Sequence, residues 1–201
     1  MPPRARARAR TYDPAKTRAA VAAQLRHIQD AVRGLDEERL GAPTRTGGRS
    51  VRELIARLPT EAEDDDRLAA RCAELVVRTD DLAAATGLDV PYDRQALATA
   101  VRVLADALAA KAPGGSVELR VPPFAVVQCV EGPRHTRGTP PNVVETDPLT
   151  WVRLAAGRIG WDEALEAADV MASGERADLS GYLPVLAPDG DIAGQSGFGG
   201  R

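Results

Sequence analysis

Apolar residues recur every three or four positions through the first half of the chain, which predicts amphipathic helices. The clearest set is Val21, Leu25, Ile28 and Val32. Asp13 and Pro14 precede it, and an Asp followed by a Pro is typical of a helix start. A capping box at Ser50 and another at Thr60 open further helices. The pattern therefore predicts helices over residues 13–34, 50–58, 60–86 and 93–112.

The pattern changes after residue 113. Residues Val117–Val121 alternate between apolar and polar side chains, which predicts a strand with one buried face. Further strands are expected over residues 124–130, 143–146 and 169–174, interleaved with helices over 147–157, 161–167 and 177–186. Helices followed by strands interleaved with helices are typical of an α+β fold. We expect a helical segment, 13–112, and a small mixed sheet covered by helices, 114–186, between disordered tails at 1–12 and 187–201.

Composition and charge narrow the classes of function. Apolar residues make up 44% of the chain but aromatic residues only 3%, so a core must be built from Ala, Val and Leu. The net charge of -3 predicts no nucleic-acid partner. No apolar run approaches the roughly 20 residues that a membrane span needs. Cys72 and Cys129 lie far apart, which favours a reducing compartment, and we expect a cytoplasmic protein.

The connection between the second and third expected strands is the sharpest candidate site. It is longer than a hairpin needs and sets polar side chains between glycines and prolines that fix the backbone. Arg134 and Arg137 could hold a carboxylate or phosphate in a bidentate manner, and His135 and Thr136 could donate further hydrogen bonds. The alternative is a structural loop whose arginines pair with nearby acids, Glu131, Glu145 or Asp147.

The second half of the chain resembles a known family. Residues 126–148, VVQCVEGPRHTRGTPPNVVETDP, are similar to the sterol-carrier-like branch found in actinobacteria, and residues 145–186 follow the order of elements at the end of a sterol carrier domain. The resemblance implies a binder of an apolar or amphiphilic ligand, with Phe124, Trp151 and Tyr182 around a cavity. The alternative is that these side chains fill the core. No cofactor is expected.

The first half resembles a different fold. Residues 50–58 and 74–82 are similar to segments of the DinB-type bundle that precedes a sterol-carrier-like domain in mycothiol-dependent maleylpyruvate isomerases. The resemblance implies a metal site made by one His, a Glu and a second His four residues later. Here these positions are Arg57, Glu74 and Arg78, and a guanidinium has no lone pair to give a metal. We expect no metal, and a surface ion pair between Glu74 and Arg78.

These observations favour non-catalytic binding or carriage of a lipid-like molecule with an anionic head group. The sequence shows no catalytic triad, P-loop or dinucleotide fingerprint, and His27 is expected to be structural. Two alternatives stay open: a thiol-dependent metal enzyme of the maleylpyruvate isomerase family, and a protein-interaction module. Homo-oligomerisation also stays open.

Overall fold

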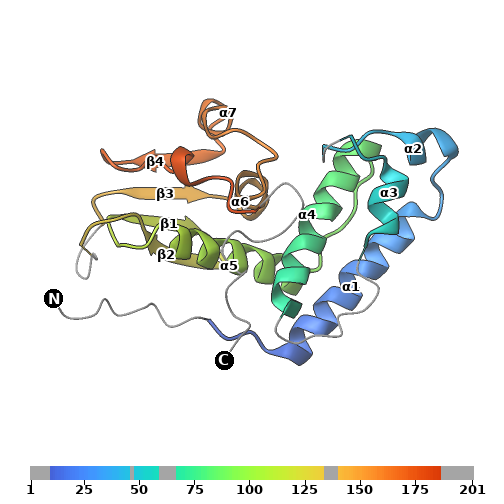
Figure 1. Ribbon diagram of the computed structural model, residues 1–201, viewed down its shortest axis with the longest axis horizontal. Helices are drawn as coiled ribbons and strands as arrows, with labels where there is room; N and C mark the ends of the chain where they lie inside the picture. Colours follow the sequence, from blue (N-terminus) through green and yellow to red (C-terminus); the bar gives the residue numbers. More distant parts are fainter. Residues whose placement is uncertain (1–9, 46–47, 59–66, 134–139, 187–201) are drawn as a thin grey trace, which may run out of the picture.

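The computed structural model describes residues 10–45, 48–58, 67–133 and 140–186. The helices before residue 87 gather at one end of an elongated molecule, and the sheet lies at the other end with the later helices (Figure 1). The expected α+β class is confirmed. None of the described helices is long and apolar enough to cross a membrane.

Within the described residues, five α-helices precede the sheet, and local capping explains where most of them begin. They are α1 (Pro14–Val32), α2 (Glu37–Gly41), α3 (Val51–Ala56), α4 (Leu68–Thr86) and α5 (Arg94–Lys111). The side chains of Asp13, Ser50 and Asp93 each accept a hydrogen bond from a backbone amide in the first turn. This satisfies donors that the helix itself leaves without a partner. Thr60, where another helix was expected to start, lies outside the described residues.

The three long helices α1, α4 and α5 pack against one another around a buried amide. Gln24 of α1 is fully buried. Its Nε2 donates to the hydroxyl of Thr79 (3.2 Å) and to the carbonyl of Pro91 (3.1 Å), and its Oε1 accepts from the amide of Asp93 (2.7 Å). Because these hydrogen bonds satisfy the amide, it fixes the packing of three segments without an unpaired polar group.

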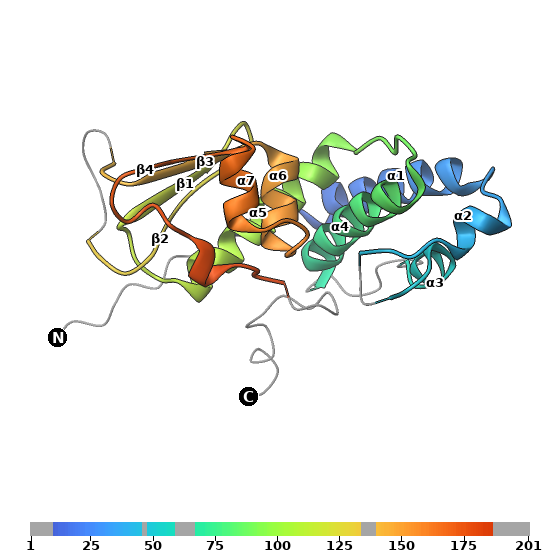
Figure 2. The ribbon, with the colours of Figure 1, turned by 90° about the horizontal axis from the view of Figure 1, so that it is seen from above.

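The sheet has four strands: β1 (Val117–Val121), β2 (Ala125–Cys129), β3 (Val143–Thr146) and β4 (Val170–Ser173). Their spatial order is β2-β1-β3-β4, and only the β1–β3 pair is parallel. Alternate residues of β1 are buried, as the period-two pattern predicts. Helix α5 packs against β2 and against α6 (Pro148–Ala155), while α7 (Trp161–Glu166) packs against β4 (Figure 2). The helices cover one face of the sheet, and Glu118 and Arg120 lie on the other.

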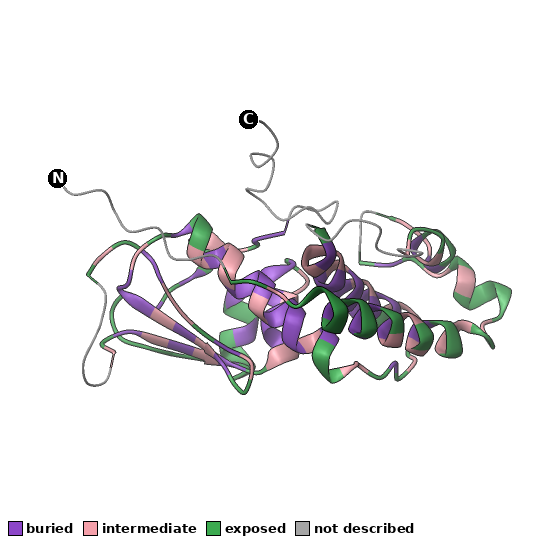
Figure 3. Ribbon diagram, turned by 90° about the horizontal axis from the view of Figure 1, so that it is seen from below, coloured by how far each residue is buried: buried purple, intermediate pink, exposed green. Residues whose placement is uncertain are grey.

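One continuous cluster of buried side chains runs from the helical end into the sheet (Figure 3). It includes Ile28 of α1, Leu75 of α4, Leu104 of α5 and Leu119 of β1, each 1% exposed or less. Since α5 contacts both α4 and β2, it joins the two ends of the molecule.

The prediction of a last helix over residues 177–186 is wrong. The structure has only a short 3-10 turn, η2 (Ser180–Tyr182). Asp178 accepts a hydrogen bond from the amide of Ser180, which favours a turn, and Gly181 and Pro184 are both poor residues for a helix interior. The short helix α2 was not expected, although Asp36 caps it.

Candidate functional site

Ser116, just before β1, fixes both ends of the segment that carries the candidate loop. Its amide and its hydroxyl donate to the carbonyl of Val130 at 3.2 and 3.3 Å. Its own carbonyl accepts from the side-chain amide of Asn142 at 2.7 Å. The two ends of the segment 131–141 are therefore both held by hydrogen bonds to the buried Ser116. Arg134, His135, Thr136 and Arg137 lie outside the described residues, and their contact with an anionic group stays a prediction.

The backbone at the start of this segment is tightly constrained. Val130 has φ 64°, a left-handed conformation that costs a β-branched residue about 1–3 kcal/mol. Its amide donates to the carbonyl of Ala112 at 2.7 Å. Gly114 has φ 158°, and a Cβ there would lie 1.9 Å from the carbonyl oxygen of Val130. The close approach therefore requires glycine at 114.

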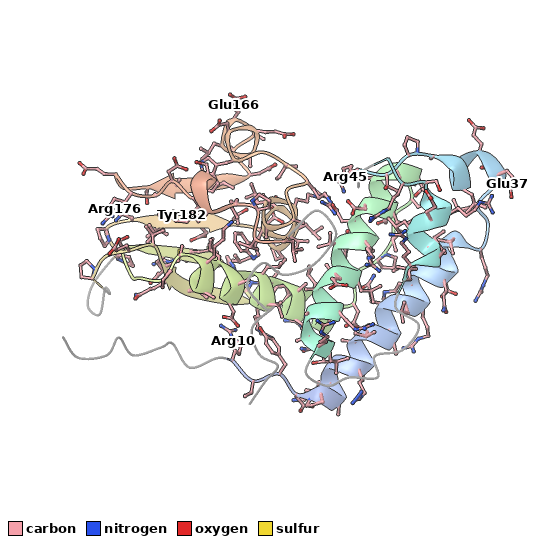
Figure 4. All side chains as sticks on the ribbon, viewed as in Figure 1. Arg10, Glu37, Arg45, Glu166, Arg176 and Tyr182 are labelled. Carbon is pink, nitrogen blue, oxygen red and sulfur yellow. The ribbon has the colours of Figure 1, made fainter. Side chains whose placement is uncertain are left out.

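Arg176 adds a cation that the sequence analysis missed. Its backbone amide donates to the side chain of Asn142 (3.0 Å), and its Nη1 would lie 3.3 Å from a Cβ built on Gly132. Figure 4 shows Arg176 at the end of the sheet where the candidate loop begins. No motif marks this residue, because its proximity to the loop depends on the pairing of β3 with β4.

The three expected ligand-contacting aromatic residues come from three elements around the same core. Trp151 of α6 is 1% exposed, and its indole Nε1 donates to the carbonyl of Val101 in α5 at 3.3 Å. Phe124, in the β1–β2 turn, is half-buried, and its carbonyl accepts from Nε of Arg102 at 3.0 Å. Tyr182 of η2 is also half-buried (Figure 4). Both half-buried rings pack against the cluster that contains Trp151.

The side chains between the sheet and its helices belong to one cluster of buried residues. Val117, Leu119 and Trp151 are 0%, 1% and 1% exposed, so almost none of their surface borders solvent or an internal void. Around these residues the core is filled. A bound apolar chain would therefore have to displace side chains rather than enter an open space.

The structure brings together Arg57, Glu74 and Arg78, the three positions that were expected to replace a metal site. Nη1 of Arg78 donates to the backbone carbonyl of Arg57, and its Nη2 lies 3.8 Å from a carboxylate oxygen of Glu74. The expected ion pair between Glu74 and Arg78 is present. Among the described residues, no three His, Cys, Asp or Glu side chains are placed to hold a metal ion.

A buried cluster of charges joins α4 to the segments around α6, and the sequence analysis did not identify it. Asp80 is 2% exposed and receives three side chains. Arg153 of α6 donates from Nε and Nη2 at 2.7–3.2 Å, Arg45 donates from Nη2 at 2.5 Å, and the hydroxyl of Tyr92 donates at 3.2 Å. Figure 4 shows Arg45 on the side of α4 that faces α6.

Asp81, the next residue, is 1% exposed and makes a second bidentate pair. Arg158 donates from Nε at 2.8 Å and from Nη2 at 3.0 Å to its two carboxylate oxygens. Nε of Arg45 lies 3.5 Å from the same carboxylate. Arg45 thus contacts both acids.

The ionisation of this cluster follows from its contacts. Burial alone would raise the pKa of Asp80, but the hydrogen bonds and charges of Arg153 and Arg45 outweigh it and leave the pKa below its usual value. Burial, followed by the charge of Asp80, raises the pKa of Tyr92. Asp80 is therefore ionised and Tyr92 neutral at neutral pH, and the contacts of Asp80 connect α4 to α6.

The two thiols are buried and unreactive in character. Burial raises the pKa of Cys72 to about 12 and that of Cys129 to about 11. A thiol reacts as its thiolate, which is scarce at neutral pH when the pKa is this high.

A search of the curated proteins finds no match to this chain. A scan against family models does find one, and it starts at residue 93, where α5 begins. The helices before α5, including the segments that resemble a DinB-type bundle, lie outside this match. Residues 93–185 match the family described as bacterial SCP ortholog, which supports the sterol-carrier-like assignment of this part of the chain.

Proposed function

We propose that residues 93–185 bind or carry an apolar or amphiphilic small molecule without changing it chemically. The match of this segment to a family of sterol carrier protein orthologs carries the proposal. The architecture agrees with it, because a small mixed sheet with helices on one face gives an apolar layer between them. A lipid-like ligand would take its place in that layer.

The apolar part of the ligand would contact Phe124, Trp151 and Tyr182. Because the core around Trp151 is filled, the ligand must displace a segment of the protein. Residues 174–186 are the best candidate, since their only helical structure is the three-residue η2 turn and both Tyr182 and Leu183 are half-buried. Burial of ~10 methylene groups contributes about 8 kcal/mol, before the costs of association and of displacement are subtracted.

The anionic head group would bind at the candidate loop. Arg134 and Arg137 can each hold a carboxylate or phosphate in a bidentate manner, with His135 and Thr136 as further donors. Arg176 supplies a cation near Gly132, at the start of this loop. The double anchor of the segment at Ser116 supports a defined position for its ends.

Titration of the delipidated full chain with cis-parinaric acid, a fluorescent long-chain fatty acid, tests the proposal. We expect saturable binding that Tyr182→Ala weakens by about tenfold, because a partly buried ring is lost from the contact. Leu165→Ala is the matched control, since Leu165 is an exposed apolar side chain on α7 (37% exposed). No saturable binding, or equal weakening by both substitutions, contradicts the proposal.

A second titration separates the head-group contact from the apolar contact. The double substitution Arg134→Ala and Arg137→Ala should weaken the binding of dodecanoate and leave the binding of dodecanol unchanged. The two ligands share the same alkyl chain and differ in charge. An equal loss for both ligands, or no loss for either, would remove the loop from the proposal.

A further inference from the structure

A small cavity lies between the start of α1 and the adjoining face of α5, away from the candidate loop. Its volume is about 280 Å³. This is slightly below the roughly 300–1,000 Å³ of sites for drug-sized molecules, so it suits a small group. The cavity is lined by Arg10, Thr11, Tyr12, Asp13, Lys16, Thr17, Gln95 and Arg102. Figure 4 shows Arg10 beside α5 at this position.

Positive charge exceeds negative charge around this cavity. Among the described lining residues, Arg10, Lys16 and Arg102 are cationic and only Asp13 is acidic. The carboxylate of Asp13 already caps α1 by accepting from the amide of Lys16. Asp106 lies next to the cavity and is occupied as well, because it accepts from the hydroxyl of Tyr12 (3.0 Å) and pairs with Nε of Arg10 (3.3 Å).

Two of the three cations have no acidic partner in the part of the chain that the structure describes. The ammonium group of Lys16 has neither an ion pair nor a hydrogen bond there. Arg102 donates its Nε to the carbonyl of Phe124 (3.0 Å), which is neutral, and makes no ion pair. Arg102 is half-buried and Lys16 is exposed, and both line one cavity without an acidic partner among the described residues, which points to an anion from outside the chain.

Tyr12 lines the cavity as a neutral side chain, and its hydroxyl already donates to Asp106. Burial, then the charge and the hydrogen bond of Asp106, raises the pKa of Tyr12, so its hydroxyl stays protonated at neutral pH. It therefore adds no negative charge to the cavity. Among the described residues, the negative charges at the cavity are those of Asp13 and Asp106, against three positive ones.

We propose that this cavity binds a phosphate group, held by the charges of Lys16, Arg10 and Arg102. The phosphate belongs either to a free small anion or to the head group of an amphiphile. The site does not depend on the proposed carrier function, because it lies between α1 and α5 rather than at the candidate loop.

Isothermal titration calorimetry of the full chain at low ionic strength tests the site, with inorganic phosphate and dodecyl phosphate as separate probes. We expect both probes to bind, and Lys16→Ala to weaken each by at least about fivefold, since one charge-assisted contact is lost. Arg26→Ala is the matched control. It removes one exposed cation from the same helix, ten residues and about 15 Å further along, and should change affinity less than twofold.

The two probes distinguish the source of the phosphate. Similar affinities for the two probes support a free anion as the ligand. A higher affinity for dodecyl phosphate that depends on Lys16 supports the head group of an amphiphile. The proposal is overturned if neither probe binds. It is also overturned if Lys16→Ala and Arg26→Ala have the same effect, because the binding then occurs elsewhere or reflects net charge alone.

Discussion

Arg153 and Asp80 form a bidentate contact that joins α6 to α4 across 73 positions of the sequence. Nη2 and Nε of the guanidinium lie 2.7 and 3.0 Å from Oδ1 of the carboxylate, and Nε lies 3.2 Å from Oδ2. The side chain of Asp80 is only 3% exposed, whereas that of Arg153 is 38% exposed. The contact therefore pairs a buried negative charge with a partly solvated cation. It also connects the helical end of the molecule to the part that matches the SCP family.

Arg153→Ala should destabilise the protein by about 1–3 kcal/mol in urea-induced unfolding. Removal of one partner of a fully buried ion pair costs roughly 3–5 kcal/mol, but Arg45 and Tyr92 remain with Asp80 and Arg153 is partly solvated. Arg120→Ala is the matched control, because Arg120 is similarly exposed (35%) and pairs with Glu118 on the open face of the sheet. The control should change the free energy of unfolding by less than about 1 kcal/mol. Equal effects of the two substitutions would show that the buried ion pair stabilises the protein no more than a surface ion pair does.

The stability of the protein should fall in acid partly through Asp80. Its pKa is lowered in the folded state, so its contribution is fully present above the unfolded value of about 3.9 and is lost as the pH falls through the lower folded pKa. Asp80→Asn should therefore be less stable than the natural chain at pH 7, with a smaller difference at pH 3. Urea unfolding at several pH values measures this. A difference that stays constant down to pH 3 would contradict the lowered pKa.

Local signals predicted the starts of most helices. Asp13, Ser50, Asp93 and Asp147 each cap a helix, because a cap depends on residues within one turn of it. The strands were placed to within one or two residues, since the period of two in β1 and the apolar runs of β2 and β3 are also local.

The errors and omissions have a common physical origin. Apolar residues over 177–186 suggested a helix, but they pack against the core from an irregular segment. Asp80 and Asp81 follow each other in a helix, a pattern typical of a solvated face, and only the distant Arg153 and Arg158 make their burial tolerable. Arg176 was missed for the same reason. Contacts between residues far apart in sequence leave no local pattern.

The expectation that Arg57, Glu74 and Arg78 replace a metal site gives a further prediction. The natural chain should retain no zinc after dialysis, because Arg57 and Arg78 cannot coordinate it. The double substitution Arg57→His and Arg78→His should bind about one zinc ion per chain together with Glu74, as measured by inductively coupled plasma mass spectrometry. Glu74→Ala added to this variant is the control and should reduce zinc retention. Stoichiometric zinc in the natural chain would revive the metal-enzyme alternative.

Native mass spectrometry of the full chain, purified without detergent, tests the central claim most directly. We predict a population that carries a small apolar molecule, released when the protein is denatured in organic solvent, and its regain when the stripped chain is incubated with dodecanoate. A spectrum with only the bare polypeptide mass, before and after that incubation, would contradict the carrier function.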